Sequence, residues 1–402
     1  MAARAGDEMS GPALMLAGFA VAGSTVEASS LLAGITISAA VGGPVLGALL
    51  DRAVRPGHLL AGALVMYATG LGVMLGGLGR WPFAVTIGIA VVTGLLGPAL
   101  SGGWTAQLPR VVPGGYLPRA NALDAMTFSA ASLAGPALAG VVAEALGASS
   151  AVVVSVVLIT LALPAAWTLP VRPGRARGAR TAPVIRDLAA GTRIIIGSPS
   201  LARATLTSVV SCVAQGMLTA CIPLLGERVL GGVGRGALLL SCAAVSALAA
   251  NAVLARFARS VAPETIVWTS ALVQAVALAL ATVGSPVMLV VAALVAGVGE
   301  GPQLAAVFAI RHREAPGDLR GQIFTTGASL KITGFAVGAA VAGPVASRSL
   351  PVALALAASV AALAALGFFA VPSAFGNPPE DRAISDRSGA GRVGSRVRRG
   401  GR

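Results

Sequence analysis

The sequence predicts an all-α integral membrane protein with twelve transmembrane helices, six before and six after a longer polar break. The chain of 402 residues is 56% hydrophobic and only 11% charged, whereas a soluble domain carries roughly a quarter charged residues. Its mean hydropathy is +0.85. Its long apolar stretches recur at the length of about 20 residues that a helix needs to cross a bilayer.

Twelve apolar segments meet this length criterion. In the first half they are residues 11–27, 29–50, 59–79, 82–106, 120–143 and 148–169. In the second half they are residues 201–225, 236–255, 265–283, 286–310, 321–346 and 350–371. The first segment is short and ends near a sequence, Ala20-Val21-Ala22, that is similar to a signal-peptide cleavage site. Because Asp7 and Glu8 do not fit a basic signal-peptide start, we expect this segment to be the first helix.

The same pattern divides the chain into four parts. We expect an N-terminal six-helix bundle over residues 1–170, a cytoplasmic linker over 171–200, a C-terminal six-helix bundle over 201–372 and a basic cytoplasmic tail over 373–402. Within the linker, VIRDLAAGTRIII favours equally a short helix on the membrane surface and a solvated connector. The tail is rich in Arg, Gly, Ser and Pro and has little to bury, which predicts disorder.

The placement of basic residues predicts the topology. In a soluble protein the net charge of +14 would suggest a nucleic-acid partner, but here the basic residues lie between apolar blocks. With both termini in the cytoplasm, all but five of the 29 Lys and Arg residues, from Arg4 onward, fall in inner segments; the exceptions are Arg80, Arg228, Arg235, Lys331 and Arg348. This asymmetry is typical of inner or plasma membrane proteins. It predicts an even number of spans and no nucleic-acid partner.

A short motif follows the second span. The turn GALLDRAVR contains Gly47, Asp51, Arg52 and Arg55, and it resembles the loop signature of the major facilitator superfamily. The equivalent turn of the second half repeats the two arginines as Arg256 and Arg259. The resemblance implies two six-helix bundles related by a pseudo-two-fold axis, the fold of that superfamily. It also implies a cytoplasmic gate, in which we include Gly47, Asp51, Arg52, Arg55, Arg119 and Asp124. We expect Asp124 to join this gate through Arg119 or Arg52, with a simple local salt bridge as an equal alternative.

A second motif lies in the fifth span. Gly135, Pro136 and Gly140 resemble the Gly-Pro motif of the superfamily's exporters, with bacterial exporters of the actinobacterial type the nearest in appearance. Gly343 and Pro344 are its counterpart in the eleventh span. Small residues at such spacings favour close helix packing. Many proton-coupled exporters of the superfamily carry an Arg in the fourth span, which this chain lacks, so the resemblance supports membership of the superfamily more strongly than proton-driven antiport.

Two charged residues fall inside predicted spans. Glu300 and Lys331 each cost a few kcal/mol at the bilayer centre if they face lipid. Each lies about eleven residues from the arginine at its cytoplasmic end, Arg311 or Arg320, which is about 16 Å along a helix. At this common depth the two side chains are candidates for an ion pair that locks two helices, or for a role in substrate binding or proton coupling. Gln303, one turn after Glu300, is expected to face the same cavity.

No pattern typical of an enzyme, a metal site or a cofactor site is present in the sequence. His58 and His312 are predicted in cytoplasmic loops, and Cys212, Cys221 and Cys242 lie in apolar segments where no disulfide is expected. We expect a monomeric secondary active transporter that exports a small molecule by alternating access, with the lipid bilayer, the substrate and protons as partners. The alternatives are an importer or facilitator on the same fold, or a membrane subunit of another complex.

Overall fold

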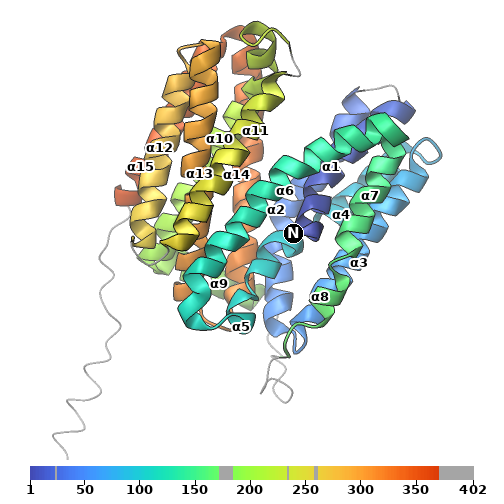
Figure 1. Cartoon of the computed structure of the whole chain (residues 1–402). Helices are drawn as coiled ribbons and strands as arrows, with labels where there is room; N and C mark the ends of the chain where they lie inside the picture. The colour runs from blue at the N-terminus through green and yellow to red at the C-terminus, as the bar shows by residue number, and fades with distance from the viewer. Residues whose placement is uncertain (23–24, 172–183, 233–234, 258–260, 371–402) are drawn as a thin grey trace, which may run out of the picture.

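The computed structural model describes residues 1–22, 25–171, 184–232, 235–257 and 261–370, and within these ranges the chain is almost entirely helical, with no strand. The long helices form two bundles that stand side by side, the first half of the chain in one and the second half in the other (Figure 1). The all-α membrane fold predicted from the sequence is confirmed.

The first bundle contains the helices of the first half of the chain. They are α1 (Ala2–Ala22), α2 (Thr25–Arg52), α3 (Pro56–Gly77), α4 (Phe83–Gly94) with the π-helical turn η1 (Ala99–Gly103), the short α5 (Leu108–Val111) and η2 (Gly114–Tyr116), α6 (Leu117–Leu146), α7 (Ala148–Thr160) and α8 (Leu163–Trp167). Gly147 separates α6 from α7 with a φ of 91°, a conformation that residues with a side chain rarely adopt.

The second bundle follows the linker helix α9 (Val184–Gly197). Its helices are α10 (Pro199–Arg228), α11 (Gly236–Arg256), α12 (Pro263–Ala281), α13 (Pro286–Glu314), α14 (Arg320–Arg348) and α15 (Leu350–Ala370). Several helices begin as their sequence dictates. In α10 and α13 a proline occupies the first turn, and the hydroxyl of the preceding Ser198 or Ser285 accepts a hydrogen bond from a backbone N–H of that turn.

Eleven helices in the described part of the chain are long and apolar enough to cross a membrane. The remaining long helix of the bundles is α1, where the structure corrects the sequence prediction. The first helix spans Ala2–Ala22 rather than residues 11–27, so Arg4, Asp7 and Glu8 lie inside the bundle. The sequence criterion placed these charges outside the membrane because it assumes lipid around every helix. Here they face other helices and a cavity.

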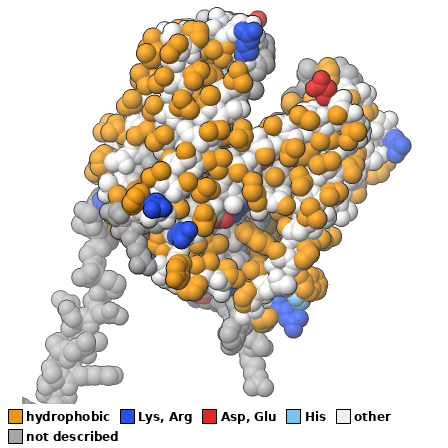
Figure 2. All heavy atoms as spheres, viewed as in Figure 1, with side chains coloured by type: hydrophobic (Ala, Val, Ile, Leu, Met, Phe, Trp, Pro, Cys, Tyr) orange, Lys and Arg blue, Asp and Glu red, His pale blue; other side chains and the backbone are white. Residues whose placement is uncertain are grey.

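Each bundle buries its own core and turns apolar side chains outward. Tyr67, Leu71 and Met74 are fully buried in the first bundle. The second bundle relies on glycine: a Cβ on Gly338 would lie 2.8 Å from the Val213 carbonyl carbon, and one on Gly297 would lie 2.8 Å from that of Ala243. Hydrophobic side chains cover the outer surface (Figure 2), as a lipid-facing surface requires.

The two bundles touch mainly through α2 with α14 and α6 with α11. They approach each other at the end where α5, α8 and α9 lie, and they splay apart at the opposite end (Figures 1 and 2). We call the first end the linker side. The linker segment beginning at residue 184 is a helix, α9, which packs against α2, α10 and α14. Residues 172–183 and the predicted tail lie outside the described residues.

Candidate functional site

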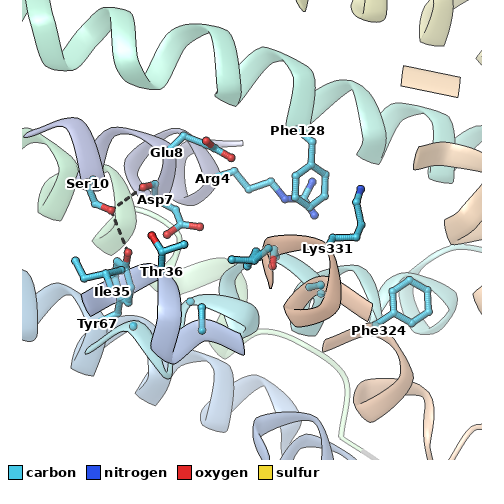
Figure 3. Close-up of a pocket in the computed structure, with 18 of the residues that line it drawn as sticks. Arg4, Asp7, Glu8, Ser10, Ile35, Thr36, Tyr67, Phe128, Phe324 and Lys331 are labelled. Atoms are coloured by element: carbon cyan, nitrogen blue, oxygen red, sulfur yellow. Dashed lines mark hydrogen bonds between the residues drawn. The ribbon is translucent and has the colours of Figure 1, made fainter. Parts of the chain in front are cut away.

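A cavity of about 380 Å³ lies between the two bundles and is the candidate functional site (Figure 3). The first bundle contributes residues of α1, α2, α3, α4, η1 and α6, and the second contributes residues of α13 and α14. The polar and charged residues of its wall are Arg4, Asp7, Glu8, Ser10, Thr36, Tyr67, Ser101, Arg311 and Lys331. Because both bundles line it, any movement of one against the other changes its shape.

The acidic residues of α1 form one wall of this cavity. Ser10 donates a hydrogen bond to the Asp7 backbone carbonyl at 2.7 Å, and its hydroxyl lies 3.0 Å from the Tyr67 hydroxyl (Figure 3). The Asp7 carboxylate is near enough to interact with the Tyr67 hydroxyl and with the Arg4 charge, and the Glu8 carboxylate with the Ser132 hydroxyl of α6. Neither carboxylate forms a salt bridge with a described residue. The sequence prediction missed both residues because it began the first helix at residue 11, beyond Asp7 and Glu8.

Arg4 belongs to the same helix and has a buried counter-charge, although its Nε has no hydrogen-bond partner among the described residues. Its guanidinium forms a salt bridge of 2.6 Å with Asp124 of α6, donates a hydrogen bond of 2.9 Å to Thr105 and lies 3.8 Å above the Phe128 ring. Both charged side chains are at least nine-tenths buried. Asp124 was predicted to join a gate with Arg119 or Arg52. The structure instead places it inside the first bundle, where it neutralises Arg4.

Asp124→Asn is expected to lower the stability of the folded protein by about 3–5 kcal/mol, because it leaves the buried Arg4 charge without a counter-charge. Denaturation of the purified protein in a detergent titration measures this effect. The double variant Arg4→Met/Asp124→Leu should recover most of the loss, since it removes both charges together. A single variant as stable as the wild type, or a double variant no better than the single one, would contradict this assignment. The exposed Glu144→Gln on the same helix is the matched control.

The second bundle presents Glu300 and Lys331. Lys331 lines the central cavity, whereas Glu300 lines a neighbouring cavity of about 360 Å³ that also touches Glu8. Glu300 is exposed to the space between the bundles. Its charge is near enough to interact with Lys331 and with Glu8. No salt bridge joins Glu300 to Lys331, so the predicted ion pair is not formed in this arrangement of the two bundles.

Gln303 does not share this environment. It is buried and lines neither cavity. Its side-chain N–H donates to the Ser211 hydroxyl at 3.1 Å, and its carbonyl accepts from Gln274 at 3.2 Å. The prediction that it faces the cavity with Glu300 is therefore wrong. Gln303 lies on the face of α13 that packs against α10 and α12. Its side chain therefore forms hydrogen bonds with both of these helices.

Three aromatic rings line the part of the cavity nearer the linker side. Phe128 of α6 lies 5.7 Å from Phe308 of α13, which lies 5.9 Å from Phe324 of α14, measured between ring centroids. These rings come from both bundles, and they pack in one apolar cluster. We call Phe128, Phe308 and Phe324 the aromatic floor. Nothing in the sequence marked them, since their meeting depends on how three distant helices cross.

Both histidines lie in helices, whereas the sequence predicted them in cytoplasmic loops: His58 is in α3 and His312 is in α13. Because α13 continues to Glu314, His312 is inside a helix and buried, with its ring 4.4 Å from that of Phe324. Arg311 is buried beside it and lines the central cavity, rather than marking the cytoplasmic end of the span. His58 stacks on Trp167 with a centroid distance of 4.2 Å.

Below the aromatic floor, the predicted gate motif joins the two bundles. The buried Asp51 carboxylate accepts hydrogen bonds from the backbone N–H groups of Gly321 and Gln322 at 2.9 and 2.8 Å. It thus caps the first turn of α14, where a negative charge is favourable. A Cβ on Gly47 would lie 2.8 Å from the Gln322 nitrogen, so only glycine lets α2 approach α14 this closely.

The linker helix reinforces this contact. Arg52 Nε donates to the Asp187 carboxylate of α9 at 2.8 Å, and Gln322 donates to the Leu188 carbonyl at 3.1 Å. One helix therefore bonds the ends of α2 and α14. Arg55 and Arg119, the other predicted gate residues, are exposed.

The glycines of the predicted packing motifs differ in role. A Cβ on Gly135 would lie 2.7 Å from the Glu8 Cβ, so this glycine fits α6 against α1. Pro136 lines the cavity that contains Glu300. Gly140 and Gly343 have open space where a Cβ would stand, and Pro344 is exposed. The prediction that Gly140, Gly343 and Pro344 form close helix contacts is therefore wrong for this arrangement of the helices. In α14, Gly334 and Gly338 make the close contacts, both against α10.

Comparison with known proteins gives a consistent result. Residues 1–271 match the family described as the Major Facilitator Superfamily. An uncharacterised MFS-type transporter, y4rN, from Sinorhizobium fredii is 28% identical over 362 residues, which cover 86% of this chain and 87% of that protein.

Solved structures resemble the fold over most of its length. The proton:xylose symporter XylE has a TM-score of 0.71 at 14% identity, covering 92% of this chain and 94% of that one. The human organic anion transporter MFSD10 has a TM-score of 0.72 at 16% identity, with 91% and 98% covered. A bacterial homologue of the iron transporter ferroportin in its outward-facing state has a TM-score of 0.66 at 16% identity, with 92% and 96% covered.

Proposed function

Because this chain belongs to the major facilitator superfamily, we propose that it is a secondary active transporter that exports a small molecule by alternating access and is driven by protons. One observation carries the proposal. A charged cavity is shared by two bundles that touch at one end and splay apart at the other. Rocking the bundles about this cavity would expose it to each side of the membrane in turn.

The contacts between the bundles on the linker side are the ones that must break for the cavity to open on that side. Asp51 with the first turn of α14, Gly47 against Gln322, and the aromatic floor all hold the two bundles together. If the linker side is cytoplasmic, as the distribution of arginines favours, this arrangement is outward-facing. Release of these contacts would then open the cavity to the cytoplasm, where an exporter collects its substrate.

The carboxylates near the cavity suit proton coupling. Asp7, Glu8 and Glu300 face the space between the bundles, and none forms a salt bridge with another described residue. When such a cavity closes and loses water, the charged form of a carboxylate becomes harder to maintain unless a proton or a cation joins it. Closure and proton uptake can therefore be coupled. Lys331 lies near Glu300 and would favour release of that proton.

Purified protein in liposomes tests this function. Intravesicular pH is followed while candidate compounds are added across an imposed proton gradient. The expected result is proton movement that depends on one class of compound. Lys331→Ala is expected to reduce it at least about tenfold, since a charged contact worth about 1.4 kcal/mol corresponds to a factor of ten. Movement of a compound without movement of protons would contradict proton coupling. Accumulation of the compound in the direction of uptake would contradict export and indicate an importer. Unchanged flux in Lys331→Ala would remove this residue from the mechanism.

A further inference from the structure

Arg311 is a buried cation with unused hydrogen-bond donors. Only 2% of the residue is exposed, yet its Nε and Nη2 have no hydrogen-bond partner. Its guanidinium lies against Gly327 of α14, where a Cβ would stand 2.6 Å from Nη1. A guanidinium carries five N–H donors and stays charged. Leaving such donors unsatisfied in a protein interior is destabilising, which suggests that an anion satisfies them at some stage of the working cycle.

Arg311 lines the central cavity, as Lys331 does. Neither residue forms a salt bridge with any residue that the structure describes, and the Arg311 guanidinium lies 5.8 Å from the centroid of the Phe324 ring. Arg4 lies at the same cavity but is already neutralised by Asp124. The second bundle therefore presents two positive charges to the cavity that are not held in a salt bridge, although Lys331 also lies near the Glu300 charge.

The opposite wall carries the opposite charge. Asp7 and Glu8 of α1 line the same cavity, and neither forms a salt bridge with a described residue, although Asp7 also feels the charge of Arg4. Apolar side chains also line the cavity, among them Ile35, Leu304, Phe308 and Ile332. Apart from Arg4, which Asp124 neutralises, the charged side chains of the cavity are acidic on the first bundle and basic on the second.

We propose that this cavity binds a small zwitterion. The anionic group of the zwitterion, a carboxylate or a phosphoryl group, accepts hydrogen bonds from Arg311 and is attracted by Lys331, while its ammonium group faces Asp7 and Glu8. An arginine fork suits an anion with two oxygen acceptors, and such charge-assisted bonds are strong. A molecule with charges at both ends would also draw the two bundles together, which links binding to closure. This inference rests on the proposed function, since it names the substrate class of the same cavity.

Thermal unfolding of the purified protein in detergent tests the inference without requiring transport. The probes are ω-amino acids of increasing chain length, with alkanoates and alkylamines of matched length as anion-only and cation-only controls. We expect one or more ω-amino acids to raise the Tm more than either control does. Arg311→Gln should weaken the apparent Kd of that compound at least about tenfold. Arg348→Gln, at the exposed end of α14, is the matched control and should bind as the wild type does.

Stability without ligand separates a binding role from a structural one. Because the Arg311 donors are unsatisfied, Arg311→Gln should unfold at the same temperature as the ligand-free wild type or at a higher one. A large fall in Tm, equal stabilisation by alkanoate and ω-amino acid, stabilisation by amine alone, or no stabilisation by any probe would each overturn the proposal. Binding of a zwitterion without transport would contradict the proposed function but support this inference. Proton-coupled transport of another compound class would support the proposed function but contradict this inference.

Discussion

Glu300→Gln is expected to abolish substrate-dependent proton movement while leaving the protein folded and inserted in the membrane. Glu300 faces the space between the bundles, close to the charges of Lys331 and Glu8. Glutamine keeps the size and hydrogen-bonding capacity of the side chain but cannot take up or release a proton. We therefore expect proton flux in liposomes to fall at least about a hundredfold, equivalent to roughly 2.8 kcal/mol.

Two comparisons make this result specific. Glu227→Gln, at the exposed end of α10, removes a carboxylate outside the cavity and should keep wild-type flux. Exchange of labelled for unlabelled substrate across the membrane needs no net proton movement, so Glu300→Gln should retain it. Full proton flux in Glu300→Gln would remove this residue from the mechanism, and loss of exchange as well would assign it to substrate binding instead.

Gly47→Leu should prevent the two bundles from closing on the linker side. A Cβ at this position already overlaps the α14 backbone at Gln322, and a leucine adds three more carbon atoms. Interiors packed at native density do not absorb such a volume without movement of the backbone. We expect transport to fall at least about tenfold, and a cysteine introduced at Ala328 in the cavity wall to react faster with a maleimide added from the linker side.

The control for this variant is Gly62→Leu. Gly62 lies on the exposed face of α3 and has open space where a Cβ would stand, so the same substitution there should leave transport and labelling unchanged. Equal loss of transport in both variants would point to a general defect of the membrane-inserted protein. Wild-type transport in Gly47→Leu would show that close approach of α2 and α14 is not needed.

Much of the fold could be predicted because the bilayer imposes a simple length rule. Eleven of the twelve predicted spans begin and end within a few residues of the helices, counting α4 with η1 and α7 with α8 as one span each; α3, for example, spans Pro56–Gly77 against a predicted 59–79. The residues of the gate motif on α2 could also be predicted from the sequence. Its partner was not, since Gly321 lies 270 residues from Asp51 and only the folded bundles bring the first turn of α14 to that carboxylate.

The errors share a physical cause. A hydropathy pattern ends a helix at the first charge, but Arg4, Asp7, Glu8 and Arg311 continue their helices because protein groups or a cavity surround them instead of lipid. The sequence also did not predict in which direction a side chain points around its helix. For this reason Gln303 was expected to face the same cavity as Glu300, and Gly140 and Gly343 were expected to contact other helices closely.

The central claim is that the two bundles rock about the charged cavity, and distances between spin labels test it most directly. In a background with Cys212, Cys221 and Cys242 replaced by serine, one pair of labels at Val111 and Phe257 reports the linker side, and another at Arg80 and Arg348 reports the opposite side; all four positions are exposed. On a change from alkaline to acidic buffer, or in Gly47→Leu, we predict that the linker-side distance lengthens while the opposite distance shortens. Distances that stay fixed under both conditions, or that change in the same direction, would contradict the account.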